Sequence, residues 1–262
     1  MEMQLRINEY WSKRSDEFAD ARYQDLHSQK KEEWLSVIRS WLPDKKEIRA
    51  LDLGTGAGFF AFLMQELGCT VTGIDYSEAM IDNAKKVMGK LGREGIVFRQ
   101  MDAQKLDFEA ESFDFIFSRN VTWTLPDPEQ AYREMYRVLA PGGCILNFDA
   151  NYGQAFKKQD LEGITEKQAV SDTSGYENPA RSLAMLKERN QIAAELGICD
   201  EKRPFWDVQV LASLGMKKIT VDLAAETHFF GGKPVSEAEK AWYNPAALFM
   251  VAAQKETHSL KK

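Results

Sequence analysis

The spacing of hydrophobic and polar residues along the chain predicts alternating strands and helices. Trp34, Val37, Ile38 and Trp41 recur at helical spacing, so residues 30–42 are expected to form an amphipathic helix. From residue 50 onward, short apolar runs alternate with helical patterns, and five of these runs are expected to be strands: 50–53, 71–75, 96–100, 113–118 and 144–149. Continuous alternation of this kind predicts a parallel, doubly wound α/β sheet.

Residues at the helix ends support the same alternation. Gly68 is expected to end the helix that follows the first strand, because glycine readily adopts the conformation of a helix C-terminus. Ser77 is expected to cap a helix over residues 78–91. Asp127 and Pro128 suit the N-cap and first positions of a helix that runs to Leu139.

The C-terminal part of the chain bears on the direction of the last strand. Residues 218–226 and 246–254 also have strand patterns. The roughly twenty residues between them are rich in turn formers, namely Gly231, Gly232, Pro234 and Pro245. Since a parallel crossover usually contains a helix, an antiparallel pairing is favoured. We therefore predict a mostly parallel, seven-stranded Rossmann-like sheet with an antiparallel last strand.

A long insertion interrupts the alternation after the fifth strand. It is polar at first and has a helical pattern over residues 179–196. Because it leaves from the edge where open α/β sheets bind ligands, we expect it to cover a substrate. The predicted division of the chain is an N-terminal helical cover (1–45), a cofactor-binding core (46–150), a helical cap or lid (151–204) and the C-terminal part of the core sheet (205–262).

The most informative motif is the turn after the first strand. Residues 50–60 read ALDLGTGAGFF, a hydrophobic strand followed by a glycine-rich turn and a helix. Glycines in such a turn let a ligand lie against backbone N–H groups. Asp75 ends the second strand, where a carboxylate can accept hydrogen bonds from a ribose. The dinucleotide fingerprint needs a third glycine where this chain has Phe59, so a nicotinamide cofactor is disfavoured.

Several motifs, in order along the chain, resemble those of the class I S-adenosyl-L-methionine (SAM) dependent methyltransferases. Residues 52–58, DLGTGAG, with Asp75 after them, resemble the first two motifs of that family. Residues 101–103, MDA, residues 113–125, FDFIFSRNVTWTL, and residues 139–143, LAPGG, resemble three later ones. The resemblance implies SAM as the cofactor, S-adenosyl-L-homocysteine (SAH) as the product, and methyl transfer by in-line displacement.

The motifs and the resemblance together give a set of expected cofactor residues. Asp75 is expected to bind the ribose, Tyr76 to pack on the adenine and Asp102 to meet its amino group, while Asp52 braces the turn. The resemblance implies that Arg119 or Asn120 meets the methionine part of the cofactor. The full expected set is Asp52, Gly54, Thr55, Gly56, Gly58, Asp75, Tyr76, Asp102, Ala103, Arg119 and Asn120.

Candidate residues for binding the methyl acceptor come from the N-terminal helical segment and from positions just after the fourth and fifth strands. They are Trp11, Arg14, Trp123, Asn151 and Tyr152. Trp123 fits a core position equally well, and Arg14 also fits a solvated helix face. His228 and Asp149 are the candidate general bases, although a lone histidine is more often structural.

Composition and charge narrow the class of protein. The chain has 262 residues, 44% hydrophobic residues and a net charge of -6, which argues against a large nucleic-acid-binding surface. Cys69, Cys144 and Cys199 lack metal-ligand spacing and suit a reducing compartment. The longest apolar run, residues 246–253, is too short to span a bilayer. We expect a soluble, cytoplasmic protein with no metal, no membrane association and no nucleic-acid partner.

Other functions remain open at this stage. A base methyltransferase acting on exocyclic amines would resemble its family in an Asn/Asp-Pro-Pro-aromatic loop, where this chain has Asn120-Val121-Thr122-Trp123. The C5-cytosine type needs a nucleophilic cysteine near that loop, and the sequence has none there. A non-catalytic SAM-binding regulator, or an RNA or protein methyltransferase, remains an alternative. The favoured prediction is a methyltransferase for a small-molecule acceptor. The residues select neither the acceptor, nor the atom methylated, nor the oligomeric state.

Overall fold

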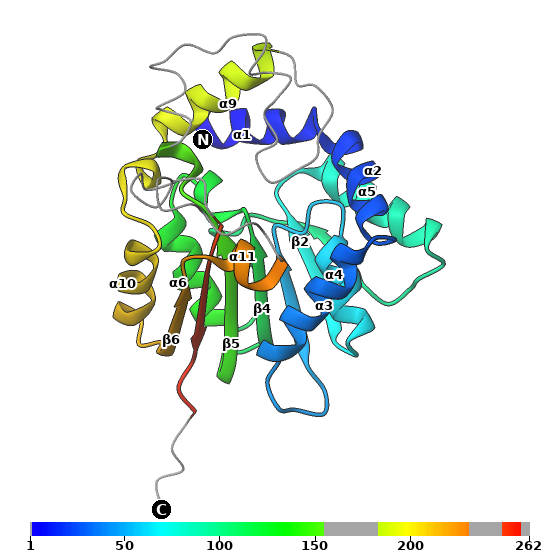
Figure 1. Cartoon of the computed structure of the whole chain (residues 1–262), viewed down its shortest axis with the longest axis vertical. Helices are drawn as coiled ribbons and strands as arrows, with labels where there is room; N and C mark the ends of the chain where they lie inside the picture. The colour runs from blue at the N-terminus through cyan, green and yellow to red at the C-terminus, as the bar shows by residue number, and fades with distance from the viewer. Residues whose placement is uncertain (1, 155–182, 231–247, 258–262) are drawn as a thin grey trace, which may run out of the picture.

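The computed structural model describes residues 2–154, 183–230 and 248–257. Seven strands form one sheet in the order β3-β2-β1-β4-β5-β7-β6 (Figure 1). Their bounds are β1 Arg49–Leu53, β2 Thr70–Asp75, β3 Val97–Gln100, β4 Phe113–Arg119, β5 Leu139–Asp149, β6 Lys217–Asp222 and β7 Phe249–Gln254. The first five strands pair in parallel, whereas β7 is antiparallel to both β5 and β6. The predicted fold class is confirmed.

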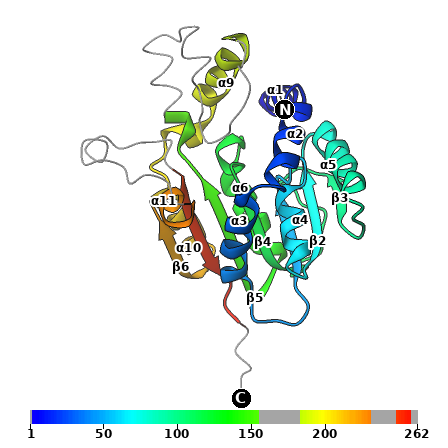
Figure 2. The ribbon, with the colours of Figure 1, turned by 45° about the vertical axis from the view of Figure 1, so that its right-hand side comes forward.

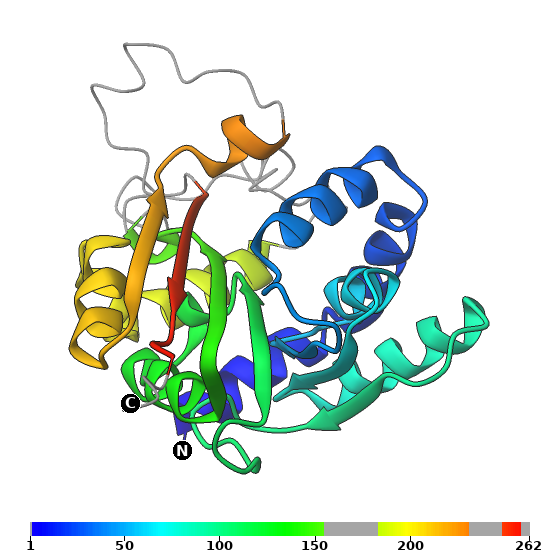
Figure 3. The ribbon, with the colours of Figure 1, turned by 90° about the horizontal axis from the view of Figure 1, so that it is seen from below.

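Helices cover both faces of the sheet, as the view from below in Figure 3 makes clear. One face carries α3 (Gln29–Trp41), α4 (Phe59–Glu66), α5 (Glu78–Lys90) and the short α11 (Ala225–Phe230). The other face carries α6 (Pro128–Val138) and α10 (Phe205–Ser213). Ser77 and Asp127 cap α5 and α6 through side-chain oxygens, as expected from the sequence.

The central strands are buried on both sides, which explains their continuous apolar pattern. Phe115 and Phe117 of β4 face the cluster under α3 and α4, while Ile116 between them faces the cluster under α6. All three side chains are fully buried. Successive side chains of a strand point to opposite faces, so a single strand contributes to both cores.

Three further helices lie beyond the upper ends of the strands. These are α1 (Glu2–Ser12), α2 (Ser15–Asp25) and α9 (Leu183–Glu195), and Figures 1 and 2 show α1 and α9 on that side of the sheet. Ile7 of α1 and Ile192 of α9 belong to one small apolar cluster with Trp123 and Tyr152. The N-terminal helices and the described part of the insertion therefore share a core above the strand ends.

Some expected boundaries are wrong. The strand expected over residues 218–226 ends at Asp222, whose carboxylate accepts a hydrogen bond from the Ala224 N–H, and α11 follows. The strand expected over residues 144–149 begins earlier, at Leu139, so the segment 139–143 is part of β5, and the register of its pairing with β4 shifts between Phe113 and Phe115.

Other expectations fall partly outside the described residues. The helix expected over 179–196 is seen as α9, and 179–182 lie outside. The predicted turn formers Gly231, Gly232, Pro234 and Pro245 also lie outside the described residues. Of the predicted cap, only residues 151–154 and 183–204 are described. No helix among the described residues is long and apolar enough to cross a membrane.

Candidate cofactor and acceptor site

A pocket lies between α1 and the C-terminal ends of β1, β2 and β4. It encloses about 800 Å³ when its open mouth is included, a size typical of small-ligand sites. Eight of the eleven residues expected to bind a cofactor line it: Gly54, Gly56, Asp75, Tyr76, Asp102, Ala103, Arg119 and Asn120. The sequence motifs therefore converge on a single cavity.

The glycine turn forms one wall of this pocket and adopts a conformation that glycine favours. Gly54, Gly56 and Gly58 have φ angles of 73°, 52° and 88°. The Thr55 N–H donates to the Ile74 carbonyl at 2.8 Å, which ties the turn to β2. A Cβ on Gly54 would lie 2.2 Å from a Val121 methyl carbon, so the turn and the loop after β4 are closely packed.

Asp52, Thr55 and Gly58 support the turn from behind rather than lining the pocket. The buried Asp52 carboxylate accepts a hydrogen bond from the Thr55 hydroxyl at 2.6 Å. Burial raises the pKa of Asp52 to about 7, although the Thr55 hydrogen bond opposes that shift. A Cβ on Gly58 would come within about 3.0 Å of Phe62 and Phe98, so this glycine permits close packing.

Asp75 lies at the end of β2 with its carboxylate already ordered. Its two oxygens accept hydrogen bonds from the Gly56 and Ser77 N–H groups, each at 2.9 Å. Burial raises the pKa of Asp75, and the backbone donors partly offset this. A carboxylate held in this way keeps lone pairs directed at the pocket, since each oxygen can accept more than one hydrogen bond.

The wall formed after β3 is linked to the N-terminal helix. Asp102 accepts hydrogen bonds from the Gln104 N–H at 2.9 Å and from the Gln104 side-chain amide at 3.0 Å. The same amide donates to the Gln4 side-chain oxygen of α1 at 3.3 Å. Asp102 and Gln4 both line the pocket.

Helix α1 supplies pocket residues that the sequence analysis missed. Gln4, Ile7 and Asn8 line the cavity together with Trp11. Their spacing of three and four residues places them on one face of the helix, and this pattern is the signal that would have identified them. The Ser12 hydroxyl of α1 lies 2.9 Å from the Ser77 hydroxyl at the start of α5. The helix therefore closes the pocket from above.

The loop after β4 forms the opposite wall. Arg119, Asn120, Val121, Thr124 and Leu125 line the pocket. Asn120 has a φ of 56°, a left-handed conformation that asparagine tolerates better than most residues, and its N–H donates to the Phe148 carbonyl. Backbone geometry of this kind recurs at binding sites.

The expected acceptor residues are mostly not in this pocket. Trp11 lines it, whereas Trp123 and Tyr152 pack against each other with ring centroids 5.3 Å apart in the apolar cluster under α9. Asn151 donates to the Glu201 carbonyl at 2.9 Å. Arg14 is buried with its guanidinium over the Tyr10 and Trp11 rings. Trp123 thus occupies the core position that was its alternative interpretation.

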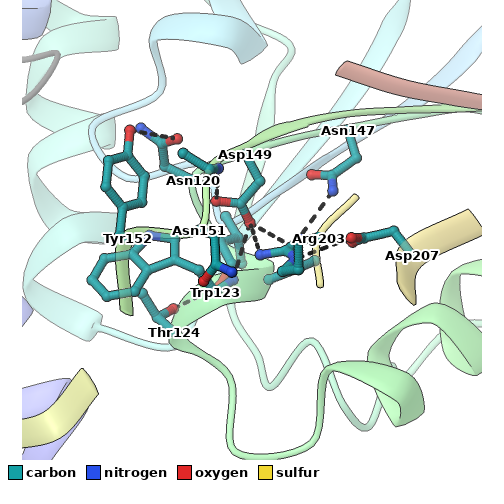
Figure 4. Close-up of polar contacts among 12 residues, drawn as sticks. Asn120, Trp123, Thr124, Asn147, Asp149, Asn151, Tyr152, Arg203 and Asp207 are labelled. Atoms are coloured by element: carbon teal, nitrogen blue, oxygen red, sulfur yellow. Dashed lines mark hydrogen bonds and ion pairs between the residues drawn. The ribbon is translucent and has the colours of Figure 1, made fainter. Parts of the chain in front are cut away.

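Neither candidate general base reaches the pocket. His228 was expected in a loop, but the strand ends early and the histidine lies in α11, where its Nδ1 is 2.8 Å from an Asp222 oxygen. Its side chain is 61% exposed. Asp149 is fully buried and is enclosed by donors from Thr122, Trp123, Ala150 and Arg203 (Figure 4). Neither residue lines the pocket.

All three cysteines are buried. Burial raises the pKa of the Cys69 thiol to about 11 and that of Cys144 to about 12. Both thiols are therefore protonated near neutral pH, and neither lines the pocket, so the geometry does not suit a cysteine nucleophile.

Comparison with curated proteins links the chain to methyltransferases. Over 99 residues it is 38% identical to a phosphatidylethanolamine N-methyltransferase of Cereibacter sphaeroides, covering 37% of this chain and 48% of that protein. Over 182 residues it is 32% identical to phosphoethanolamine N-methyltransferase 2 of Caenorhabditis elegans, covering 62% of this chain and 41% of that protein. The chain spans less than half the length of these curated relatives.

Solved structures share the fold. Haemonchus contortus phosphoethanolamine N-methyltransferase 2, solved with SAM, superposes with a TM-score of 0.58 at 20% identity, covering 85% of this chain and 52% of that chain. A SAM-dependent methyltransferase of Thermotoga maritima, described as a possible histamine N-methyltransferase, gives 0.54 at 19% identity and covers 95% and 99%.

The region that carries the sequence motifs is also the region that matches a family model. Residues 51–147 match the model described as a methyltransferase domain, and they contain the glycine turn, Asp75, Asp102 and the loop after β4. The strand order, the antiparallel β7 and these motifs all match what the resemblance to methyltransferases predicts. Residues 51–147 are therefore similar to a methyltransferase domain in sequence, and the sheet around them has the strand order of a methyltransferase fold.

Proposed function

We propose that this protein binds SAM in the pocket under α1 and transfers its methyl group to a small-molecule acceptor. The observation that carries the proposal is the convergence of the glycine turn, the Asp75 carboxylate and Asp102 on one cavity of suitable size. The turn leaves space that a Cβ on Gly54 or Gly56 would fill. These features fit a nucleoside cofactor with a short charged tail.

Each wall has a separate task in this proposal. Asp75 accepts hydrogen bonds from the ribose hydroxyls, while Tyr76 and Asp102 hold the adenine. Arg119 and Asn120 lie toward the methionine part of the cofactor. Bound SAM supplies the electrophilic methyl group, and the acceptor's lone pair must approach it in line at about 3 Å.

The protein contributes orientation and exclusion of water. Helix α1 closes the pocket with Ile7 and Trp11, so the reacting groups are shielded from solvent. No step requires a nucleophile from the protein. A small acceptor is favoured because the described pocket lies under a helix, which would hinder a polymeric substrate.

The names of several relatives support a small-molecule acceptor without selecting one. They include an arsenite methyltransferase of Halobacterium salinarum and a ubiquinone biosynthesis O-methyltransferase of Pseudomonas entomophila, besides the enzymes named above. The acceptor atom is therefore left open among nitrogen, oxygen, sulfur, carbon and other nucleophiles.

Calorimetry with SAM and SAH tests the cofactor assignment. Asp75→Ala should weaken SAH binding by about 2 kcal/mol, because two ribose hydrogen bonds are lost. Asp107→Ala is a matched control, since Asp107 is a carboxylate with an 88% exposed side chain outside the pocket. The Asp107→Ala variant should bind SAH with the same affinity as the unaltered protein. Absence of binding by folded, unaltered protein would refute the proposal.

Turnover separates an enzyme from a non-catalytic SAM-binding regulator. SAH formation is measured with a panel of small amines, phosphorylated amines, quinols and arsenite. We expect at least one acceptor to release SAH faster than the background without acceptor. SAH binding combined with no turnover on any acceptor, including RNA and protein, would favour the regulator.

A further inference from the structure

A fully buried polar cluster lies beside the pocket and has no part in the proposed chemistry. It joins Thr122 in the loop after β4, Asp149 at the end of β5, Arg203 just before α10 and Asp207 in the first turn of α10. Figure 4 labels Asp149, Arg203 and Asp207. All four residues have relative exposures of 0% or 1%. A buried ionic cluster is costly to desolvate and is by itself a weak source of stability.

Arg203 lies between the two carboxylates. One of its nitrogens donates to Asp149 at 3.2 Å, and two donate to Asp207 at 3.0 and 2.6 Å. Burial alone lowers the pKa of Arg203, but Asp207 and Asp149 raise it by more, so the guanidinium stays charged. Tyr132 and Asn147 complete the cluster, through a hydrogen bond from the Tyr132 hydroxyl to Asp207 and one from Asn147 to that hydroxyl.

Thr122 connects this cluster to the pocket wall. Its hydroxyl donates to Asp149 and accepts from Arg203 at 2.6 Å, and the neighbouring Trp123 N–H donates to Asp149 at 3.0 Å. The residues on either side, Val121 and Thr124, line the pocket. The cluster therefore fixes the loop in the middle of its pocket-lining segment.

The position of that loop affects the glycine turn directly. Val121 fills the space next to Gly54, where even one added carbon would overlap with it. A displaced loop would thus change the cradle that faces the cofactor. Because protein interiors are closely packed, such a shift is transmitted rather than absorbed.

Asp149 and Arg203 also join the two ends of the insertion after β5. Two residues further into the insertion from each end, the Asn151 side-chain amide donates to the Glu201 carbonyl at 2.9 Å. Three segments therefore meet at the Asp149 carboxylate: the loop after β4, the start of the insertion, and the end of the insertion just before α10. Both Asp149 oxygens already accept hydrogen bonds there, so the carboxylate is engaged in holding backbone.

Building on the proposed function, we propose that Thr122, Asp149 and Arg203 are positioning residues that hold the loop after β4 against the glycine turn. Asp149 accepts hydrogen bonds from this loop and does not remove a proton from the acceptor. Arg203 donates to both Asp149 and the Thr122 hydroxyl and so holds the two side chains together. Through this cluster, the shape of the cofactor pocket depends on the packing of the residues at which the insertion begins and ends.

Three mild substitutions test this role in the full-length chain. Thr122→Val keeps the side-chain shape and removes the hydroxyl, whereas Thr122→Ser keeps the hydroxyl. Tyr132→Phe is the matched control, because it removes a buried hydroxyl from the same cluster whose hydrogen-bond partners are Asp207 and Asn147 and not residues of the loop. The readouts are SAH affinity by calorimetry, amide hydrogen exchange of residues 120–124, and the free energy of unfolding in urea.

The expected pattern separates positioning from general stabilisation. Thr122→Val should weaken SAH binding about tenfold and speed exchange in residues 120–124 by a similar factor. Thr122→Ser and Tyr132→Phe should stay within about twofold of the unaltered protein in both readouts, even where Tyr132→Phe lowers stability. Equal effects of Thr122→Val and Tyr132→Phe, or no effect of Thr122→Val, would overturn the inference. If the unaltered protein does not bind SAH, the proposed function fails, and the exchange pattern alone decides whether the cluster holds the loop.

Discussion

Asp52 shows how one buried carboxylate can make stability depend on pH. Its pKa of about 7 in the folded protein exceeds the ordinary value of 3.8, mainly because of burial. Between those values the folded protein retains a proton that the unfolded chain releases. The free energy of unfolding should therefore fall as pH rises from about 4 to 7, by about 4 kcal/mol for this group, and then level off.

Asp52→Asn removes this titration while retaining an oxygen that can accept the Thr55 hydrogen bond. Urea unfolding at several pH values should give a flatter profile for the variant, and the difference between the two profiles isolates Asp52. Asp107→Asn, at an exposed position, serves as the control. Parallel profiles for the unaltered protein and Asp52→Asn would contradict the assignment.

Gly54 combines a backbone constraint with a packing constraint. Its φ of 73° disfavours any side chain, and a Cβ would collide with Val121. Gly54→Ala should therefore cost about 2–4 kcal/mol of stability, measured by urea unfolding. Gly89→Ala is the comparison, since Gly89 lies in α5 with open space around it, and alanine there should add up to about 1 kcal/mol. Similar values for both variants would mean that the turn is not under this constraint.

Residues set by local motifs could be predicted from the sequence, while those set by distant contacts could not. Gly54, Gly56 and Asp75 follow from a contiguous strand, turn and strand, so their convergence on the pocket was foreseeable. Trp123 and Tyr152 were expected to face an acceptor. They lie instead in one apolar cluster with Tyr10 of α1 and Ile192 of α9. These residues are far apart in the sequence, so no local pattern predicts that they meet.

At the scale of elements, helix α1 is paired with α9 by ion pairs. Arg6 forms ion pairs with Glu188 and Glu195 of α9, at 3.1 and 2.9 Å. Arg6→Met should cost less than about 1 kcal/mol of global stability, because these pairs are partly exposed. It should nevertheless speed amide exchange across residues 2–12, measured by mass spectrometry. Lys13→Met, which removes an exposed pair within the N-terminal segment, is the control.

Loss of several kcal/mol on Arg6→Met would contradict this local role, as would unchanged exchange in α1. The pairing itself illustrates what periodicity misses. The sequence predicted an N-terminal helical cover and a helix over residues 179–196. It gave no reason to place residues 2–12 beside residues 183–195, because charged pairs on exposed helix faces are common and unspecific.

At the scale of the whole molecule, strand order was the most predictable property and loop placement the least. Alternating strands and helices leave few topologies once crossovers are right-handed, so the parallel sheet follows from pattern alone. The antiparallel β7 followed from the absence of a crossover helix. A boundary such as the end of β6 is harder to predict, because there the Asp222 carboxylate accepts a hydrogen bond from the Ala224 N–H where the chain turns into α11.

Binding of SAH should change both the stability of the whole molecule and the exposure of helix α1. If SAH binds the folded state alone, a concentration one hundred times its dissociation constant adds about 2.7 kcal/mol of stability. For a chain of this size that corresponds to a rise in Tm of roughly 5–10 °C. Because Gln4, Ile7, Asn8 and Trp11 line the same pocket, ligand should also protect α1 from proteolysis and amide exchange. A rise in Tm with α1 unprotected would place the ligand elsewhere, since a molecule bound beneath this helix cannot leave its opening equilibrium unchanged.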